Sequence, residues 1–154
     1  MARQSIFISM SGTPKKVLFI CKGNWFRSQI AVAIYNTLTN SDQAESAGTY
    51  VGAPDEPEGQ KLSSLFASDD FFCVMEEHGM YIRNNTTKRL REEVLASYDI
   101  VVAMVEEPFI PEFLKKDKTI IWWEVENPEF VDRKVSEDTY QKIYLLVTNL
   151  INSS

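Results

Sequence analysis

VLFICKGNWFRS, residues 17–28, is the stretch of sequence that decides the fold class of this chain. Its first four residues form a short continuous apolar run, which is typical of a β-strand buried on both faces of a sheet. Residues 22–27 interrupt this run, and from Ser28 to Leu38 apolar side chains recur at helical spacing. The stretch therefore predicts a strand, a short loop and a helix that begins near Ser28, the first half of a β-α-β unit.

Further strands and helices alternate along the rest of the chain. Apolar runs predict strands at 44–47, 100–104 and 119–122, and helical spacing predicts helices at 69–78, 87–96 and 135–151. This alternation predicts a three-layer, doubly wound α/β domain with a parallel sheet and helices on both faces. We expect residues 15–154 to form this single domain, and residues 1–14 to be a flexible lead-in without the full apolar segment of a signal peptide.

Composition limits the classes of function that remain open. The 154 residues are 44% hydrophobic and 25% charged, which is typical of one globular domain. A net charge of −6 argues against nucleic-acid binding, and no apolar run is long enough to cross a membrane. Two cysteines and one histidine favour a reducing compartment and leave too few ligands for a zinc site. We therefore expect a cytoplasmic protein that needs no metal or cofactor.

The loop between the predicted strand and helix carries the residues for phosphate chemistry. Gly23 and Asn24 tolerate positive φ, so the backbone N–H groups can turn inward and, with the helix N-terminus, hold a phosphate. Arg27 adds a fork of donors for two phosphate oxygens. Cys21 lies in the same positive field, which favours a nucleophilic thiolate. A Cys-x5-Arg spacing alone often arises by chance, and a cysteine that ends a strand is usually a core residue; the flanking strand and helix favour the phosphate loop.

Several segments together resemble one enzyme family. Residues 17–28 resemble the nucleophile loop of the low-molecular-weight protein tyrosine phosphatases, and the resemblance extends over about residues 16–152. The other matching segments are Ser46–Thr49, Gly79–Leu90, Tyr98–Met104 and Asn127-Pro128. The resemblance implies a four-stranded parallel sheet and the hydrolysis of phosphotyrosine or aryl phosphate monoesters through a phosphocysteine intermediate.

The resemblance also assigns roles to individual residues. Cys21 becomes the nucleophile and Arg27 the phosphate clamp, and Ser28 donates a hydrogen bond to the thiolate, a role compatible with that of a helix N-cap. The phosphate-binding residues are Lys22, Gly23, Asn24, Trp25, Phe26 and Arg27. Asn24 holds the strained turn of the loop, with Ser46 and Asn85 as supports. Trp25, Tyr50 and Phe130 are expected as aromatic walls around the substrate ring, although each also suits ordinary packing.

Four positions depart from the family pattern. Phe26 stands where many members carry a second cysteine, Asn85 replaces a histidine, and residues 52–68 form a longer connection. Asn127 replaces the aspartate that acts as general acid, and an amide cannot donate a proton at neutral pH. We therefore expect weak turnover of phenolic esters and a steep dependence on the leaving group, unless another carboxyl replaces the acid. The candidates are Glu126, Glu129 and Asp132.

Two other functions remain open. The first is a binding module that captures phosphotyrosine with little turnover, because Asn127 lacks the proton of an acid. The second is a thiol-linked arsenate reductase, which passes oxidation to two further cysteines beyond the third strand. Residues 102–111 contain no cysteine, and Cys73 is the other thiol of the chain, so this second alternative is disfavoured.

Overall fold

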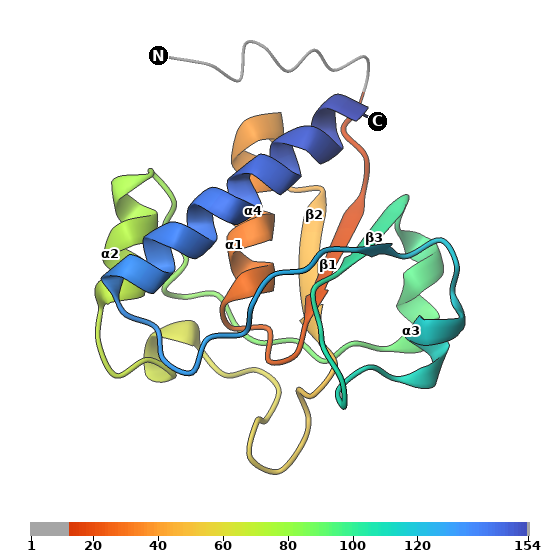
Figure 1. Ribbon diagram of the computed structural model, residues 1–154, viewed down its shortest axis with the longest axis horizontal. Helices are drawn as coiled ribbons and strands as arrows, with labels where there is room; N and C mark the ends of the chain where they lie inside the picture. The colour runs from red at the N-terminus through yellow and green to blue at the C-terminus, as the bar shows by residue number, and fades with distance from the viewer. Residues whose placement is uncertain (1–12, 154) are drawn as a thin grey trace.

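A four-stranded parallel sheet forms the centre of the protein. The structure is a computed structural model and describes residues 13–153. The strands are β1 (Val17–Cys21), β2 (Ala44–Gly48), β3 (Ile100–Ala103) and β4 (Ile121–Trp122), in the order β2-β1-β3-β4 (Figure 1). Strand β1 pairs in parallel with both β2 and β3, and all five of its residues are buried. The predicted parallel α/β fold is therefore confirmed.

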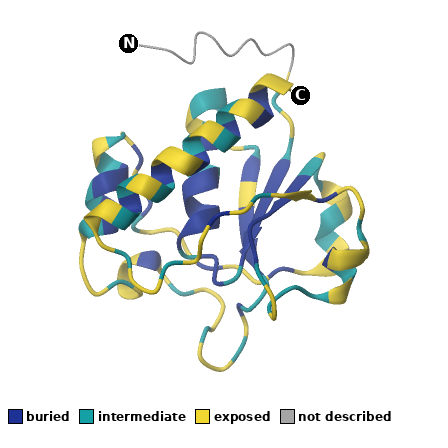
Figure 2. Cartoon of the chain, viewed as in Figure 1, coloured by how far each residue is buried: buried dark blue, intermediate teal, exposed yellow. Residues whose placement is uncertain are grey.

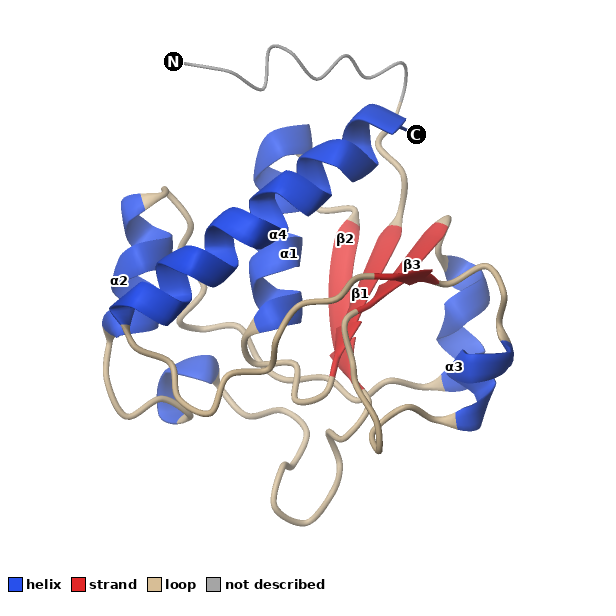
Figure 3. Ribbon diagram, viewed as in Figure 1, coloured by secondary structure: helices blue, strands red, loops and turns tan. Residues whose placement is uncertain are grey.

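Helices cover both faces of the sheet and make the three-layer arrangement (Figure 3). On one face lie α1 (Arg27–Thr39), α2 (Asp70–Glu77) and α4 (Arg133–Ser153), whose buried side chains join Phe19 and Val102 in one core cluster. The opposite face holds the 3₁₀ helix η3 (Glu92–Ser97) and α3 (Glu112–Lys116), packed on Leu18 and Ile20. The alternation of side chains along β1 thus supplies both cores, and Figure 2 shows the buried strands between the helical layers. Within residues 13–153, no helix is long and apolar enough to span a membrane.

The predicted helix over 87–96 is wrong. Residues 87–91 are extended beside the end of β2, where Gly48 N–H donates to the Lys88 carbonyl and Leu90 N–H donates to the Gly48 carbonyl, both at 2.9 Å. Only 92–97 forms a helix, of the 3₁₀ type. Pairing with the sheet end satisfies these backbone groups and overrides the helical propensity of the segment.

Other boundaries differ less. Strand β4 has two residues where 119–122 was expected, and the five-residue α3 was not expected from the sequence pattern. The predicted lead-in, residues 1–14, lies outside the described residues except for its last two positions. A short 3₁₀ helix, η2 (Leu62–Ser64), interrupts the long connection between β2 and α2. This connection and the carboxyl ends of β1 and β3 meet at the N-terminus of α1, where ligands bind in sheets of this kind.

Candidate active site

Cys21 is the last residue of β1, and residues 22–26 carry the chain directly into α1. Its Sγ atom accepts a hydrogen bond from the Asn24 backbone N–H at 3.3 Å and lies 3.1 Å from Ser28 Oγ. Because Asn24 Nδ2 donates to the same Oγ at 2.8 Å, the Ser28 hydroxyl is free to direct its proton to the sulfur. Two donors thus face Sγ, the arrangement that stabilises a thiolate.

Asn24 holds the turn of the loop from the inside. It has a left-handed backbone with φ of 59° and is completely buried. Its Oδ1 accepts a hydrogen bond from Lys88 N–H at 2.7 Å, and its backbone carbonyl accepts one from Gln29 Nε2 at 2.9 Å. Asn85 Nδ2 in turn donates to Gln29 Oε1 at 3.1 Å. Asn85 therefore contacts the loop indirectly, through Gln29. The sequence did not indicate Gln29 as a loop support, because no sequence pattern marks a glutamine in this role.

Ser46 has a different position from the one expected of a loop support. It is buried in β2, paired in register with Phe19. Within residues 13–153, no hydrogen bond joins its side chain to Asn24 or to another residue of the loop. The loop contact of this segment is made instead by the neighbouring Gly48, where a Cβ would come within 2.6 Å of the Lys22 carbonyl oxygen.

The backbone of the loop has the form of an anion-binding nest. The carbonyls of Cys21 and Lys22 point out of the loop, toward the segment after β2. Cys21 O accepts a hydrogen bond from Thr49 N–H at 3.0 Å, and Lys22 O accepts one from Tyr50 N–H at 2.9 Å. The N–H groups of Gly23, Trp25 and Phe26 have no acceptor among residues 13–153. Together with the first turn of α1, they offer the donors that bind a phosphate-type anion.

Arg27 is anchored on one side only. Its side chain is 3% exposed, and Nη1 donates to the carbonyls of Met104 and Val125 and to Glu106 Oε1, the last at 2.9 Å. Nε and Nη2 have no partner among the described residues. The guanidinium is therefore fixed by two loops beyond β3 and β4 while two of its nitrogens stay available for phosphate oxygens.

A small cavity of about 50 Å³ lies over Cys21. It is lined by Cys21, Lys22, Gly23, Trp25, Phe26, Arg27, Glu56 and Asn127. Most of these residues are the expected loop residues, and Asn127 comes from the distant segment before α4. Its Nδ2 donates to Glu106 Oε2 at 3.3 Å, so one carboxylate joins Asn127 to Arg27. Glu56, from the long connection after β2, was missed because no sequence pattern places that connection over the loop.

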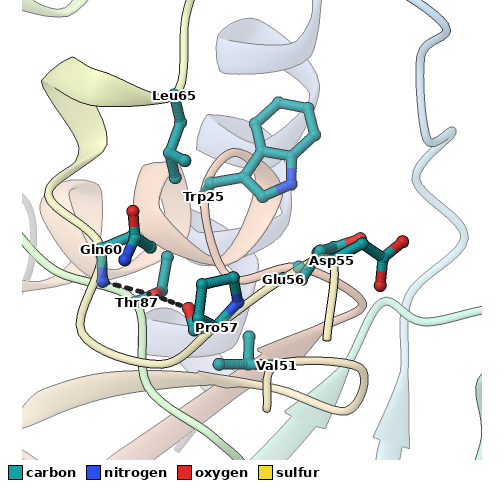
Figure 4. A pocket seen from close by; sticks show the side chains of 9 residues that line it. Trp25, Val51, Asp55, Glu56, Pro57, Gln60, Leu65 and Thr87 are labelled. Atoms are coloured by element: carbon teal, nitrogen blue, oxygen red, sulfur yellow. Dashed lines mark hydrogen bonds between the residues drawn. The ribbon is translucent and has the colours of Figure 1, made fainter. Parts of the chain in front are cut away.

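A larger cavity of about 370 Å³ adjoins the first one (Figure 4). The two share three lining residues, Gly23, Trp25 and Glu56. In Figure 4, Trp25 and Leu65 stand at one end of the cavity, Val51 and Pro57 at the other, and Asp55 and Glu56 along one side. Apolar and aromatic walls with a few polar groups are typical of a site for an organic ligand.

The other two expected aromatic walls lie elsewhere. Tyr50 packs edge-on against Phe109 at 5.2 Å between ring centres, with Lys22 Nζ 4.8 Å above the Tyr50 ring. Phe130 is 77% exposed and borders a separate depression at the start of α4. Neither residue lines the two cavities at Cys21. Of the three aromatic residues predicted as walls, Trp25 is the one that lines them.

The three acids proposed to replace Asp at position 127 also lie outside the small cavity. Glu126 and Glu129 line the depression beside Phe130. Asp132 Oδ1 accepts the N–H of Val135 at 2.8 Å and so caps the first turn of α4.

The connection that contributes Glu56 is held down by Glu58. This carboxylate accepts hydrogen bonds from the Arg91 guanidinium and from Arg89 N–H, each at 3.0 Å for the shortest contact. The hydrogen bond from Arg91, followed by that from Arg89 N–H, lowers the pKa of Glu58 to about 2. The loop is thus attached to the extended segment beside β2.

Comparisons with known proteins agree with this geometry. Residues 16–153 match the sequence model of a family described as low molecular weight phosphotyrosine protein phosphatase. A human protein of that name is 28% identical over 101 residues, which cover 60% of this chain and 56% of the human protein. The chain therefore spans little more than half the length of this relative.

Solved structures give the same result for the fold. The low molecular weight protein tyrosine phosphatase from T. tengcongensis is 28% identical, with a TM-score of 0.69 over 92% of this chain and 100% of that chain. An arsenate reductase from Archaeoglobus fulgidus is also 28% identical, with a TM-score of 0.63 over 88% and 98%. Since the family model spans residues 16–153, the chain belongs to the low molecular weight phosphotyrosine protein phosphatase family.

Proposed function

We propose that this protein hydrolyses phosphotyrosine or other aryl phosphate monoesters through a phosphocysteine intermediate. The observation that carries the proposal is the position of Cys21 Sγ, which faces two hydrogen-bond donors in a small cavity that Arg27 also lines. Phosphate oxygens in this cavity meet the free loop N–H groups and the two free nitrogens of Arg27. Such fixed donors stabilise the charge that develops on the transferred phosphoryl group.

Cys21, Ser28 and the adjoining cavity have separate roles in the proposed reaction. The Cys21 thiolate attacks phosphorus in line with the ester oxygen, and the S–P bond forms as the P–O bond breaks. Ser28 stabilises the thiolate again when water displaces it in the second step. The aryl group lies in the adjoining cavity against Trp25 and Leu65, which favours aromatic over small alkyl esters. Because the thiol must stay reduced, we place this activity in a reducing compartment such as the cytoplasm.

Asn127 favours a second candidate function, a module that binds phosphotyrosine but hydrolyses it slowly. The side chain lines the phosphate cavity as an amide donor, and a positioned acid in its place typically contributes about 10²–10⁴-fold in rate. Thiol-linked arsenate reduction has no such support, because the second cysteine, Cys73, lies in α2 rather than beyond β3.

A single-turnover measurement separates these functions. Enzyme in excess is mixed with an aryl phosphate of an acidic phenol, and released phenol and inorganic phosphate are followed by rapid quench. We expect release from the wild type, a stoichiometric burst of phenol before phosphate, and neither product from Cys21→Ser. Cys73→Ser is the matched control and should behave as the wild type. Stable binding without release identifies the binding module, and release by Cys21→Ser removes the phosphocysteine mechanism.

A further inference from the structure

We infer that Glu56 is the proton donor to the leaving group, a catalytic residue that stands in for the missing acid at position 127. This inference rests on the proposed phosphatase function and assigns one more residue of the same site. Glu56 comes from the connection after β2, on a different segment from Asn127.

The position of Glu56 between the two cavities is the first observation. The cavity over Cys21 is small, about 50 Å³, and Glu56 is one of the eight residues that line it. The ester oxygen joins the phosphate in this cavity to the aryl group in the adjoining one. Gly23, Trp25 and Glu56 line both cavities. Among these three residues, Glu56 alone has a side chain that belongs to the acids used in general acid–base catalysis.

The two oxygens of Glu56 have different surroundings. Oε2 accepts a hydrogen bond from Lys22 Nζ at 3.1 Å, and Lys22 is itself held over the rings of Tyr50 and Phe109. Oε1 is buried and has no hydrogen-bond partner within the described residues. It reaches over the phosphate loop, because a Cβ on Gly23 would come within 2.8 Å of it. Lys22 thus orients the carboxyl, and Oε1 is left without a partner beside Gly23 of the phosphate loop.

No other carboxyl within residues 13–153 combines these properties. Glu106 Oε1 and Oε2 are both engaged, by Arg27 and by Asn127, and Glu106 does not line either cavity. Glu126 and Glu129 line the depression beside α4, and Asp132 caps that helix. Asp55 lines the larger cavity but not the one over Cys21.

The proton transfer closes a balanced cycle. As the thiolate of Cys21 forms the S–P bond, the electron pair of the breaking P–O bond stays on the aryl oxygen, which takes the proton from Glu56 Oε1 and leaves as a phenol. The Glu56 carboxylate then takes a proton from water as the water oxygen attacks phosphorus. The S–P bond breaks, its electron pair returns to Cys21, and inorganic phosphate leaves while Glu56 is again protonated.

The test measures how kcat depends on the leaving group. A series of phenyl phosphates with substituents that change the acidity of the phenol is turned over by wild type, Glu56→Gln and Glu129→Gln. We expect Glu56→Gln to lower kcat by about 10²-fold or more for phosphotyrosine and phenyl phosphate, with a much smaller loss for the most acidic phenols. Glu129→Gln makes the same chemical change at an exposed residue outside both cavities and should keep the wild-type slope of log kcat against the pKa of the phenol.

Asn127→Asp supplies a rescue that a structural role of Glu56 cannot explain. In the Glu56→Gln background it should restore most of the lost kcat for phenyl phosphate, and in the wild-type background it should change kcat far less. Such non-additivity is expected when two groups supply the same proton. Competitive inhibition by inorganic phosphate and thermal unfolding, measured for each variant, report that the phosphate loop and the fold are intact.

The outcomes separate this inference from the function on which it rests. Suppose that the wild type is active and Cys21→Ser is inactive. If Glu56→Gln then keeps the wild-type slope of log kcat against the pKa of the phenol, or gains kcat/KM, the assignment of Glu56 is wrong and the phosphatase function stands. If Glu106→Gln, and not Glu56→Gln, makes kcat depend steeply on the pKa of the phenol, the assignment of Glu56 is also wrong. If the wild type releases no phosphate from any ester of the series, the proposed function and the inference both fail.

Discussion

A single asparagine carries the strain of the phosphate loop. The left-handed backbone costs an L-residue about 1–2 kcal/mol, and Asn24 adopts it with φ of 59°. Its side chain makes two hydrogen bonds, a buried one to Ser28 Oγ and a partly buried one from Lys88 N–H, each worth about 0.5–1.5 kcal/mol. Glycine would relieve the strain but lose both bonds. The asparagine thus ties the turn to the residue that faces the nucleophile.

Arg27 gives the first residue-scale prediction. In Arg27→Lys the ammonium can replace the contacts of Nη1 to the carbonyls of Met104 and Val125, but it has no second and third nitrogen for phosphate oxygens. We expect kcat for aryl phosphates to fall by about 10²–10³-fold, together with weaker competitive inhibition by phosphate. Steady-state kinetics with both readouts are the measurement.

Arg83→Lys is the matched control for that change. Arg83 is likewise ion-paired, with the carboxylates of Glu76 and Asp69, but it lies at the surface beside α2. The substitution Arg83→Lys should therefore leave kcat for aryl phosphates unchanged. Wild-type kinetics in Arg27→Lys would mean that the guanidinium does not hold the phosphate.

At the scale of elements, the connection between β2 and α2 determines what surrounds the phosphate loop. Its backbone N–H groups at 49 and 50 bond to the carbonyls of Cys21 and Lys22, and its side chains form most of the larger cavity. The segment has little regular structure apart from η2. Its position therefore depends on a few anchors, such as the ion pair of Glu58 with Arg91.

Glu58→Gln tests this anchor. Because the pair is partly exposed, the variant should lose less than about 1 kcal/mol of global stability, while amides of residues 52–60 exchange faster with solvent. We expect KM for aryl phosphates to rise as the loop over the cavity loosens. Glu92→Gln, an exposed charge on η3, is the control and should change neither. Hydrogen exchange followed by mass spectrometry gives the local readout.

The same anchor has a defined pH dependence. The pKa of Glu58 is lowered in the folded protein from 4.5 to about 2, so its contribution is complete above about pH 4.5 and is lost as pH falls toward 2. Protection of residues 52–60 should fall over this range in the wild type, relative to intrinsic exchange rates, and should not change there in Glu58→Gln. Equal pH profiles would show that another group holds the loop.

At the scale of the whole molecule, the proposed function requires the protein to bind an anion against its own net charge of −6. The phosphate site is therefore a local arrangement of donors within a repulsive field. We expect kcat/KM for a dianionic aryl phosphate to rise, by about twofold or more, between about 0.01 M and 0.15 M sodium chloride, as the Debye length shortens from about 30 Å to about 8 Å. Sulfate salts are avoided because sulfate competes for the phosphate loop.

A neutral reference isolates the long-range effect of salt. The rate of alkylation of Cys21 by iodoacetamide, which carries no charge, should change little over the same range, whereas alkylation by iodoacetate should accelerate with salt. A fall of kcat/KM with salt would indicate that local positive charge dominates the approach of the substrate.

The sequence by itself determined the strand-loop-helix of residues 17–39, the parallel sheet and the loop residues of the phosphate site. These features depend on contacts close in sequence: an apolar run for β1, helical spacing for α1, and loop residues that must lie between them. The pattern placed Cys21, Asn24 and Arg27 in one loop, the family resemblance added the role of Ser28, and the structure brings these four residues together.

The tertiary structure alone decided what covers the loop. Residues 87–91 look helical in sequence but pair with the end of β2, because the unpaired backbone groups of the sheet end are a stronger constraint than a weak propensity. Phe130 is exposed although an aromatic wall was expected, and Glu56 lines the cavity although its segment has no motif. Side chains from segments more than 30 residues away reach the loop only after the sheet and helices have packed, so no local pattern encodes their direction.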